Sequence, residues 1–346
     1  MDFFIDLLRG GLDALTEYLS AHVLTCLVPA FFIAGAISAF LSQAAILKYF
    51  GAQANKWLSY SVASISGTIL AVCSCTVLPL FGGIYKRGAG LGPAITFLYA
   101  APAINVLAII YSARLLGYDI GIARAIMAIL FSVIIGVIMA FIYRREQSQV
   151  DTKAFDMVAA QESEGKGIRL QVLFLLTLVG ILVFAAAKQW AIAGILLVIL
   201  AITLWRFFSK SEMSLWMKET WRFVRLVIPW LLGGVFVAGM IRVGVPESAI
   251  NAAVGGNSLL ANFAASFVGA IMYFATLTEV PIVRSFLDLG MGKGPALALL
   301  LAGPALSLPS MLVIRKIIGT KKMLVYVSLV VVMATFSGYI FGLITQ

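Results

Sequence analysis

Charged side chains are scarce in this sequence. Asp, Glu, Lys and Arg make up only 12% of its 346 residues, whereas 62% are hydrophobic. Soluble domains are about half apolar and carry about a quarter charged residues. The mean hydropathy of +1.04 leaves too little polar surface to face water on all sides. We therefore expect most of the surface to face lipid.

Cysteine, histidine and several catalytic motifs are also rare or absent. The three cysteines, Cys26, Cys73 and Cys75, lie at apolar positions and do not form a disulfide framework. The single histidine, His22, precedes an apolar run. The sequence contains no P-loop, no H-E-x-x-H and no G-x-S-x-G. It therefore predicts no ATP hydrolysis and no enzyme of these classes, and we expect no cofactor.

Long apolar runs dominate what is present. Each has roughly 20 residues, which is enough to cross a bilayer as a helix. The ten runs cover residues 20–42, 57–79, 92–113, 121–143, 168–187, 190–208, 222–243, 259–283, 294–314 and 322–343. Because lipid offers no partner to backbone polar groups, such runs are expected to be helical. The sequence predicts an all-α, polytopic membrane protein with the lipid bilayer as its surroundings.

An internal repeat organises these runs. Ser64–Gly117 aligns with Ser266–Gly319 without a gap at an offset of 202 residues, and Pro29 matches Pro229 at an offset of 200. We therefore predict two homologous repeats, and the pattern leaves open whether they are parallel or inverted. The predicted organisation is an amphipathic segment at 1–19 rather than a cleavable signal, a first repeat at 20–143, a polar cytoplasmic linker at 144–167, two connecting helices at 168–208, a basic loop at 209–221 and a second repeat at 222–343. The net charge of +10 is spread over many loops, which predicts membrane topology rather than nucleic-acid binding.

Prolines at matching positions are predicted to break the helices. Proline has no N–H group and frees the carbonyl four residues earlier, and in a membrane that carbonyl needs another partner. We expect breaks near the midplane at Pro79, Pro102, Pro281 and Pro304. Membrane proteins built from two repeats are typically transporters, whose substrate sites lie on interrupted helices at the repeat interface.

Polar residues accompany the predicted breaks. The candidates for substrate binding are Cys73, Cys75, Thr76, Asn105, Thr278, Glu279 and Ser307. Among them, Glu279 is the only acidic residue within a long apolar run. An intramembrane carboxylate is costly and by default marks a functional site, and it suits a proton or cation relay. The alternative is a structural pairing with Arg284.

The thiols of Cys73 and Cys75 predict a transient site for a soft metal. Residues i and i+2 point apart on a helix but share a face in an extended segment. Thiolates prefer Cu(I), Zn(II) and, by extension, trivalent arsenic or antimony. Two ligands are too few for a closed structural zinc site. The alternative is that these cysteines are small apolar residues that permit close packing.

The blocks CSCTVLPLFGGIYKRGAGLGPAITFLYAAPAINVLA and TEVPIVRSFLDLGMGKGPALALLLAGPALSLPS resemble the predicted permease family that includes ArsP-type organoarsenical exporters and YraQ-like proteins. The resemblance implies a multi-pass permease of the cell inner membrane. Some members of that family export trivalent arsenicals and others are linked to divalent or soft metals. The family's motif cysteines fall on Cys73 and Cys75, and its polar half-helix residue falls on Asn105.

These observations lead to one main hypothesis and two alternatives. We expect a secondary transporter that exports a soft metal, metalloid or organoarsenical between the two repeats, coupled to a proton or another ion through Glu279. The alternative cargo is a small sulfur compound or thiol that resembles glutathione. The remaining alternative is a membrane thiol oxidoreductase.

Overall fold

The fold is helical, as the sequence predicts. A computed structural model describes residues 2–20, 28–40, 55–70, 74–86, 88–144, 168–186, 189–244, 254–272, 279–288 and 290–345. Within these ranges there is no named strand, and one isolated bridge joins Gly255 and Met291. Three of the predicted residues, Cys26, Cys73 and Thr278, lie outside the described residues, and for Cys75 only the backbone is described.

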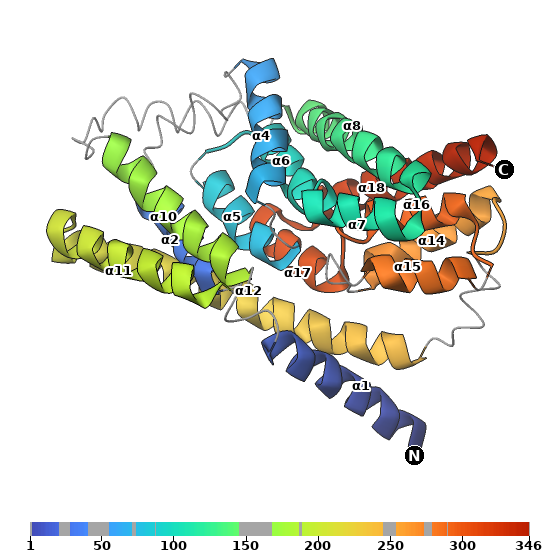
Figure 1. The fold of residues 1–346 in the computed structure, drawn as a ribbon, viewed down its shortest axis with the longest axis horizontal. Helices are drawn as coiled ribbons and strands as arrows, with labels where there is room; N and C mark the ends of the chain where they lie inside the picture. The colour runs from blue at the N-terminus through green and yellow to red at the C-terminus, as the bar shows by residue number, and fades with distance from the viewer. Residues whose placement is uncertain are drawn as a thin grey trace.

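Figure 1 shows the order of the helices along the chain. The first part contains α1 (Asp2–Tyr18), α2 (Val28–Phe40), α4 (Lys56–Leu70), α5 (Ser74–Lys86), α6 (Leu91–Ala103), α7 (Val106–Leu116) and α8 (Tyr118–Ile142). Next come α10 (Ile168–Ala186) and α11 (Trp190–Phe207), which pack on each other. The last part contains α12 (Lys210–Gly244), α14 (Leu259–Ile271), α15 (Glu279–Asp288), α16 (Lys293–Ala302), α17 (Leu308–Ile318) and α18 (Thr320–Ile344).

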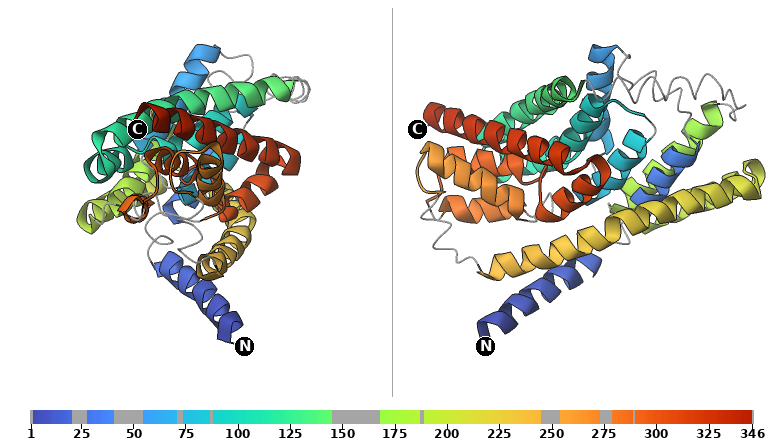
Figure 2. Two further views of the ribbon diagram at one scale, coloured as in Figure 1. Left: turned by 90° about the vertical axis from the view of Figure 1, so that its right-hand side faces the viewer. Right: turned by 180° about the vertical axis from the view of Figure 1, so that it is seen from behind.

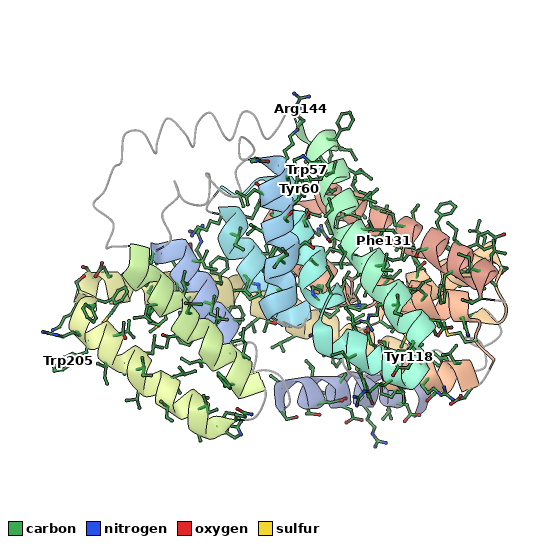
Figure 3. All side chains as sticks on the ribbon, turned by 45° about the horizontal axis from the view of Figure 1, so that its top comes forward. Trp57, Tyr60, Tyr118, Phe131, Arg144 and Trp205 are labelled. Atoms are coloured by element: carbon green, nitrogen blue, oxygen red, sulfur yellow. The ribbon has the colours of Figure 1, made fainter. Side chains whose placement is uncertain are left out.

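Four of the described helices, α8, α11, α12 and α18, are long and apolar enough to cross a membrane. The bent pair of α6 and α7, with 45° between its two helices, is a fifth candidate. Exposed aromatic residues lie near helix ends, among them Trp57, Tyr118 and Trp205 (Figure 3), and Trp and Tyr favour the membrane–water interface. The chain is therefore a multi-pass membrane protein.

The ten apolar runs do not all form continuous helices, and the four runs in which breaks are predicted are the ones that are interrupted. Four of the apolar runs are each divided between two short helices in the structure. These runs are 57–79 (α4 and α5), 92–113 (α6 and α7), 259–283 (α14 and α15) and 294–314 (α16 and α17). The prolines and glycines in these runs make a continuous helix unfavourable, so an apolar run in this chain is not the same as one straight spanning helix.

The short helices α6 and α16 lie at the centre of the fold. Every residue of α6 is buried, and so is α16 from Gly294 to Ala302. Helix α6 packs between α4 and α8, and α16 packs between α14 and α18. Close approach at each crossing depends on glycine: a Cβ added at Gly92 would lie 3.0 Å from the carbonyl oxygen of Gly136, and one added at Gly294 would lie 2.6 Å from that of Gly338. The two crossings use positions 202 residues apart.

Helix bounds follow the same offset, and the matching helices run in opposite directions. Both ends of α8 and α18 are separated by 202 residues. The ammonium group of Lys322, at the start of α18, lies 5.3 Å from the ring centroid of Tyr143, just past the end of α8. At the other end, Nζ of Lys293 lies 2.6 Å from the carboxylate of Asp119 in the first turn of α8, and the start of α16 contacts the last part of α18. Figure 2 shows the same antiparallel course. Antiparallel matching helices are the arrangement of inverted repeats, and the internal repeat itself stays a prediction.

Helix α1 forms within the predicted amphipathic segment and packs along α12. Its Gly11 lies so close to α12 that an added Cβ would be 2.6 Å from the ring of Phe236. The acidic and apolar residues of α1 alternate with helical spacing, as expected for a helix at a membrane surface. Its position at that surface stays a prediction.

Candidate functional site

A fully buried ion pair joins the two parts of the chain. Arg124, in the second turn of α8, donates through Nη2 to Oε1 of Glu279, the first residue of α15. Both side chains have 0% exposed surface. Arg124 also donates through Nη1 to the hydroxyl of Ser112 at 2.8 Å, and this hydroxyl donates to the carbonyl of Ala108 at 2.7 Å. The guanidinium group therefore connects α7, α8 and α15.

The local structure explains why each charge is tolerated. Glu279 lies in the first turn of α15, where unpaired N–H groups and the helix dipole favour a carboxylate. Arg124 lies on a helix that is apolar beyond its first turn and is accepted there because its charge is paired. The pair is not fully satisfied, since Nε of Arg124 and Oε2 of Glu279 have no hydrogen-bond partner among the described residues. The carboxylate keeps one oxygen that can accept a proton, a cation or a donor group from cargo.

The predicted structural pairing of Glu279 with Arg284 is wrong. Arg284 pairs instead with Asp288, four residues along α15, at 3.0 Å and with both side chains exposed. Residues five apart on a helix do not share a face, so the side chain of Arg284 is poorly placed to form an ion pair with Glu279. Arg124 is not among the site residues predicted from the sequence. Its signal was available, because Arg124 is a basic residue within an apolar run that also needs an intramembrane partner.

Two buried tyrosines complete the polar centre around α16. The hydroxyl of Tyr99 on α6 donates to the carbonyl of Leu301 at 3.3 Å, and that of Tyr326 on α18 donates to the carbonyl of Ala305 at 3.3 Å. Leu301 lies in the last turn of α16, where carbonyls lack intrahelical donors, and Ala305 lies in the turn that follows this helix. Pro304 lies in the turn between α16 and α17, so hydroxyl groups satisfy the backbone around this break.

The four prolines predicted to break helices differ in where they lie relative to the helix ends. Pro304 lies between two helices, Pro281 lies in the first turn of α15, and Pro102 is next to the last residue of α6. Pro79 does not end a helix, since α5 continues through it to Lys86. A proline inside a helix removes one hydrogen bond but can be tolerated where the freed carbonyl has another partner.

Two predicted site residues are helix caps. Oδ1 of Asn105, between α6 and α7, accepts from the backbone N–H of Ala108 at 3.4 Å. The hydroxyl of Ser307 accepts from the backbone N–H of Ser310 at 3.3 Å at the start of α17. Both side chains are buried and occupy matching positions of the two halves. They stabilise the starts of the second half-helices, and a substrate-binding role for them stays a prediction.

The thiol site also stays a prediction. Thr76 is buried in the first turn of α5, one residue after Cys75. In the part of the chain that the structure describes, no three His, Cys, Asp or Glu side chains gather as a metal site. Cys73 and the side chain of Cys75 are outside that part.

Comparisons with known proteins give the family. A family model described as a predicted permease (ArsP_1) matches residues 10–343. The chain belongs to this permease family. UPF0718 protein MJ0584 of Methanocaldococcus jannaschii is 44% identical over 363 aligned positions, which cover 100% of this chain and 99% of that protein. UPF0718 protein YraQ of Escherichia coli is 24% identical over 262 positions, which cover 75% of this chain and 61% of YraQ.

No solved structure matches the chain significantly. The family and the apolar helices together establish a membrane permease that acts on a small-molecule substrate within a lipid bilayer. As a permease it is a transporter rather than an enzyme.

Proposed function

We propose that this permease is a secondary transporter in which one half moves against the other, and that the pair of Arg124 and Glu279 stabilises one of the two states. The observation that carries the proposal is this ion pair, which joins α8 to α15 with both charges buried. Matching helices of the halves run antiparallel, and inverted halves that rock about a central site are a common basis of alternating access. Contacts between two moving parts exist in one state and are replaced in the other.

Glu279 couples this movement to an ion. A proton or another cation on the carboxylate weakens its attraction to Arg124, while the guanidinium group keeps its hydrogen bond to Ser112. The unpartnered Oε2 provides the place for that proton or cation. A ligand shifts a conformational equilibrium only through different affinities for the two states. Here the two affinities for the ion differ because the ion competes with Arg124 for the carboxylate of Glu279 in one state only.

The cargo is a soft metal, a metalloid or an organoarsenical, exported across the cell inner membrane. The support is chemical: Cys75 is the second residue of α5 and Cys73 precedes that helix in the sequence, and thiolates favour soft cations. Thr76, Asn105 and Ser307 contribute polar groups at neighbouring helix starts. Thr278, directly before Glu279, matches Thr76 in the other half.

Transport into proteoliposomes tests the proposal. A trivalent phenylarsenical, Cu(I), Zn(II) and glutathione are offered with and without a pH gradient. We expect gradient-driven transport of a thiol-seeking cargo by the wild type and its loss in Cys73→Ser/Cys75→Ser, with Cys26→Ser as the matched control. Transport of glutathione alone would replace the metal proposal with the sulfur-compound alternative. Transport that is unaffected by the double serine variant would exclude thiol capture.

A further inference from the structure

A pocket of about 600 Å³ lies between α5, α12 and α17. The three helices contact one another and lie together in Figure 1. None of the pocket's lining residues belongs to the buried ion pair or to the tyrosines around α16. Its lining includes four cationic side chains, contributed by all three helices: Lys86, Arg222, Arg225 and Lys316.

The positive charge of this pocket is only partly balanced. Glu219 on α12 forms ion pairs with Lys86 and, at 3.9 Å, with Arg222. For Arg225 and Lys316, no carboxylate lies within 4 Å among the described residues. Four cations therefore face one carboxylate. Such an excess in a concave site attracts anions because the surrounding low-dielectric walls concentrate the field.

Aromatic rings contact the two cations, Arg225 and Lys316, that have no carboxylate partner in the described part of the chain. The ammonium group of Lys316 lies 4.3 Å from the ring centroid of Trp230, and the guanidinium group of Arg225 lies 5.3 Å from that of Trp221. These cation–π contacts orient the cations without neutralising them. Trp221 is 55% exposed, as expected for a tryptophan at the membrane–water interface.

The position of the pocket along the helices also indicates that interface. Lys86 lies in the last turn of α5 and Lys316 in the last turn of α17. Arg225 lies on α12 just before its sequence becomes apolar. The carbonyl ends of α5 and α17 favour these cations. Phe223 and Ile317 complete the pocket with apolar surface.

We propose that this pocket binds a phosphate group, supplied by the headgroup of an anionic phospholipid or by a free phosphate anion. Arg and Lys are the side chains that recognise phosphate oxygens, and basic pockets between membrane helices bind anionic headgroups. The apolar wall next to the cations suits the start of an acyl chain. The site is separate from the transport proposal and does not depend on it.

Binding to the purified full-length protein in neutral detergent tests this proposal. Phosphatidylglycerol, phosphatidylcholine and inorganic phosphate are titrated separately, with bound lipid measured by native mass spectrometry and phosphate by calorimetry. The variant Arg225→Gln/Lys316→Gln removes two cations without breaking an ion pair. The control Lys218→Gln/Lys321→Gln removes the same charge from exposed sites outside the pocket.

We expect the wild type to bind phosphatidylglycerol more tightly than phosphatidylcholine. The pocket variant should weaken that binding about five-fold for each cation removed, whereas the control should not. Competition by inorganic phosphate would assign the site to a free anion, and lack of competition would assign it to a lipid headgroup. Equal wild-type affinity for the two lipids, with no phosphate binding, would overturn the proposal. Equal weakening in both double variants would overturn it too, as would loss of binding in the charge-retaining Arg225→Lys/Lys316→Arg.

Discussion

The buried ion pair predicts a large and strongly non-additive effect on stability. In Glu279→Gln or Arg124→Gln, one charge is removed and its partner stays at membrane depth with no exposed surface. Breaking a buried ion pair in this way costs about 3–5 kcal/mol. Because a glutamine amide still forms a hydrogen bond with the remaining partner, we expect the lower end, about 3 kcal/mol, for each single variant.

The double variant Arg124→Gln/Glu279→Gln removes both charges. Neutral replacement of a buried pair is often close to neutral, so we expect it to lose less than either single variant. A double-mutant cycle then yields a coupling free energy of about 3 kcal/mol or more. The control is Arg284→Gln, which breaks the exposed pair with Asp288 and should cost at most about 1 kcal/mol.

The free energy of unfolding can be measured by titrating the purified protein in mixed micelles with SDS, followed by far-UV circular dichroism. Transport by the folded double variant reports on coupling separately, and we expect it to be independent of the pH gradient. A cost below about 1 kcal/mol for each single variant, with additive costs in the double variant, would contradict a strong buried ion pair. Such a result would mean that water or other groups already screen the two charges.

Two further predictions concern the helices around this pair. Gly338→Ala should destabilise the protein by about 1–3 kcal/mol through overpacking, since its Cβ would lie 2.5 Å from the carbonyl oxygen of Gly294. In contrast, Gly233→Ala on α12 should be neutral or stabilising, because nothing lies within 4 Å of an added Cβ. Equal thermal midpoints for the two variants would contradict the close crossing of α16 and α18. Tyr326→Phe should cost about 1 kcal/mol because it leaves the carbonyl of Ala305, in the turn between α16 and α17, without its donor. The chemical-denaturation midpoint measures this loss of stability. Tyr118→Phe, at a 73% exposed position, should leave that midpoint unchanged. An equal decrease of the midpoint in both variants would refute a specific role for the buried hydroxyl of Tyr326.

Much of the fold follows from local patterns, whereas the site depends on distant contacts. Hydrophobicity predicts where helices occur, and Pro304 marks an interruption because its missing N–H acts locally. Hydrophobicity cannot predict where a run is divided into two short helices. Pro79 shows that a proline does not always interrupt a helix, because α5 continues through it.

One member of the buried ion pair could be predicted from the sequence and its partner could not. The cost of burying a carboxylate identified Glu279, but spacing along the chain offered only Arg284 as a partner. Arg124 is 155 residues away in the sequence, and only the antiparallel packing of the two halves brings it to Glu279. The relative direction of the halves was undecided for the same reason, since a sequence offset has no direction in space.

The distance between α8 and α15 in lipid vesicles tests the central claim most directly. Spin labels attached through unnatural amino acids replace Tyr118 and Ser285, which are both exposed, so that the native cysteines stay intact. Pulsed electron resonance then measures the distance with and without cargo and a pH gradient. The account predicts two populations whose ratio shifts with the gradient and whose shift is lost in Glu279→Gln. One unchanged distance under all of these conditions would contradict it.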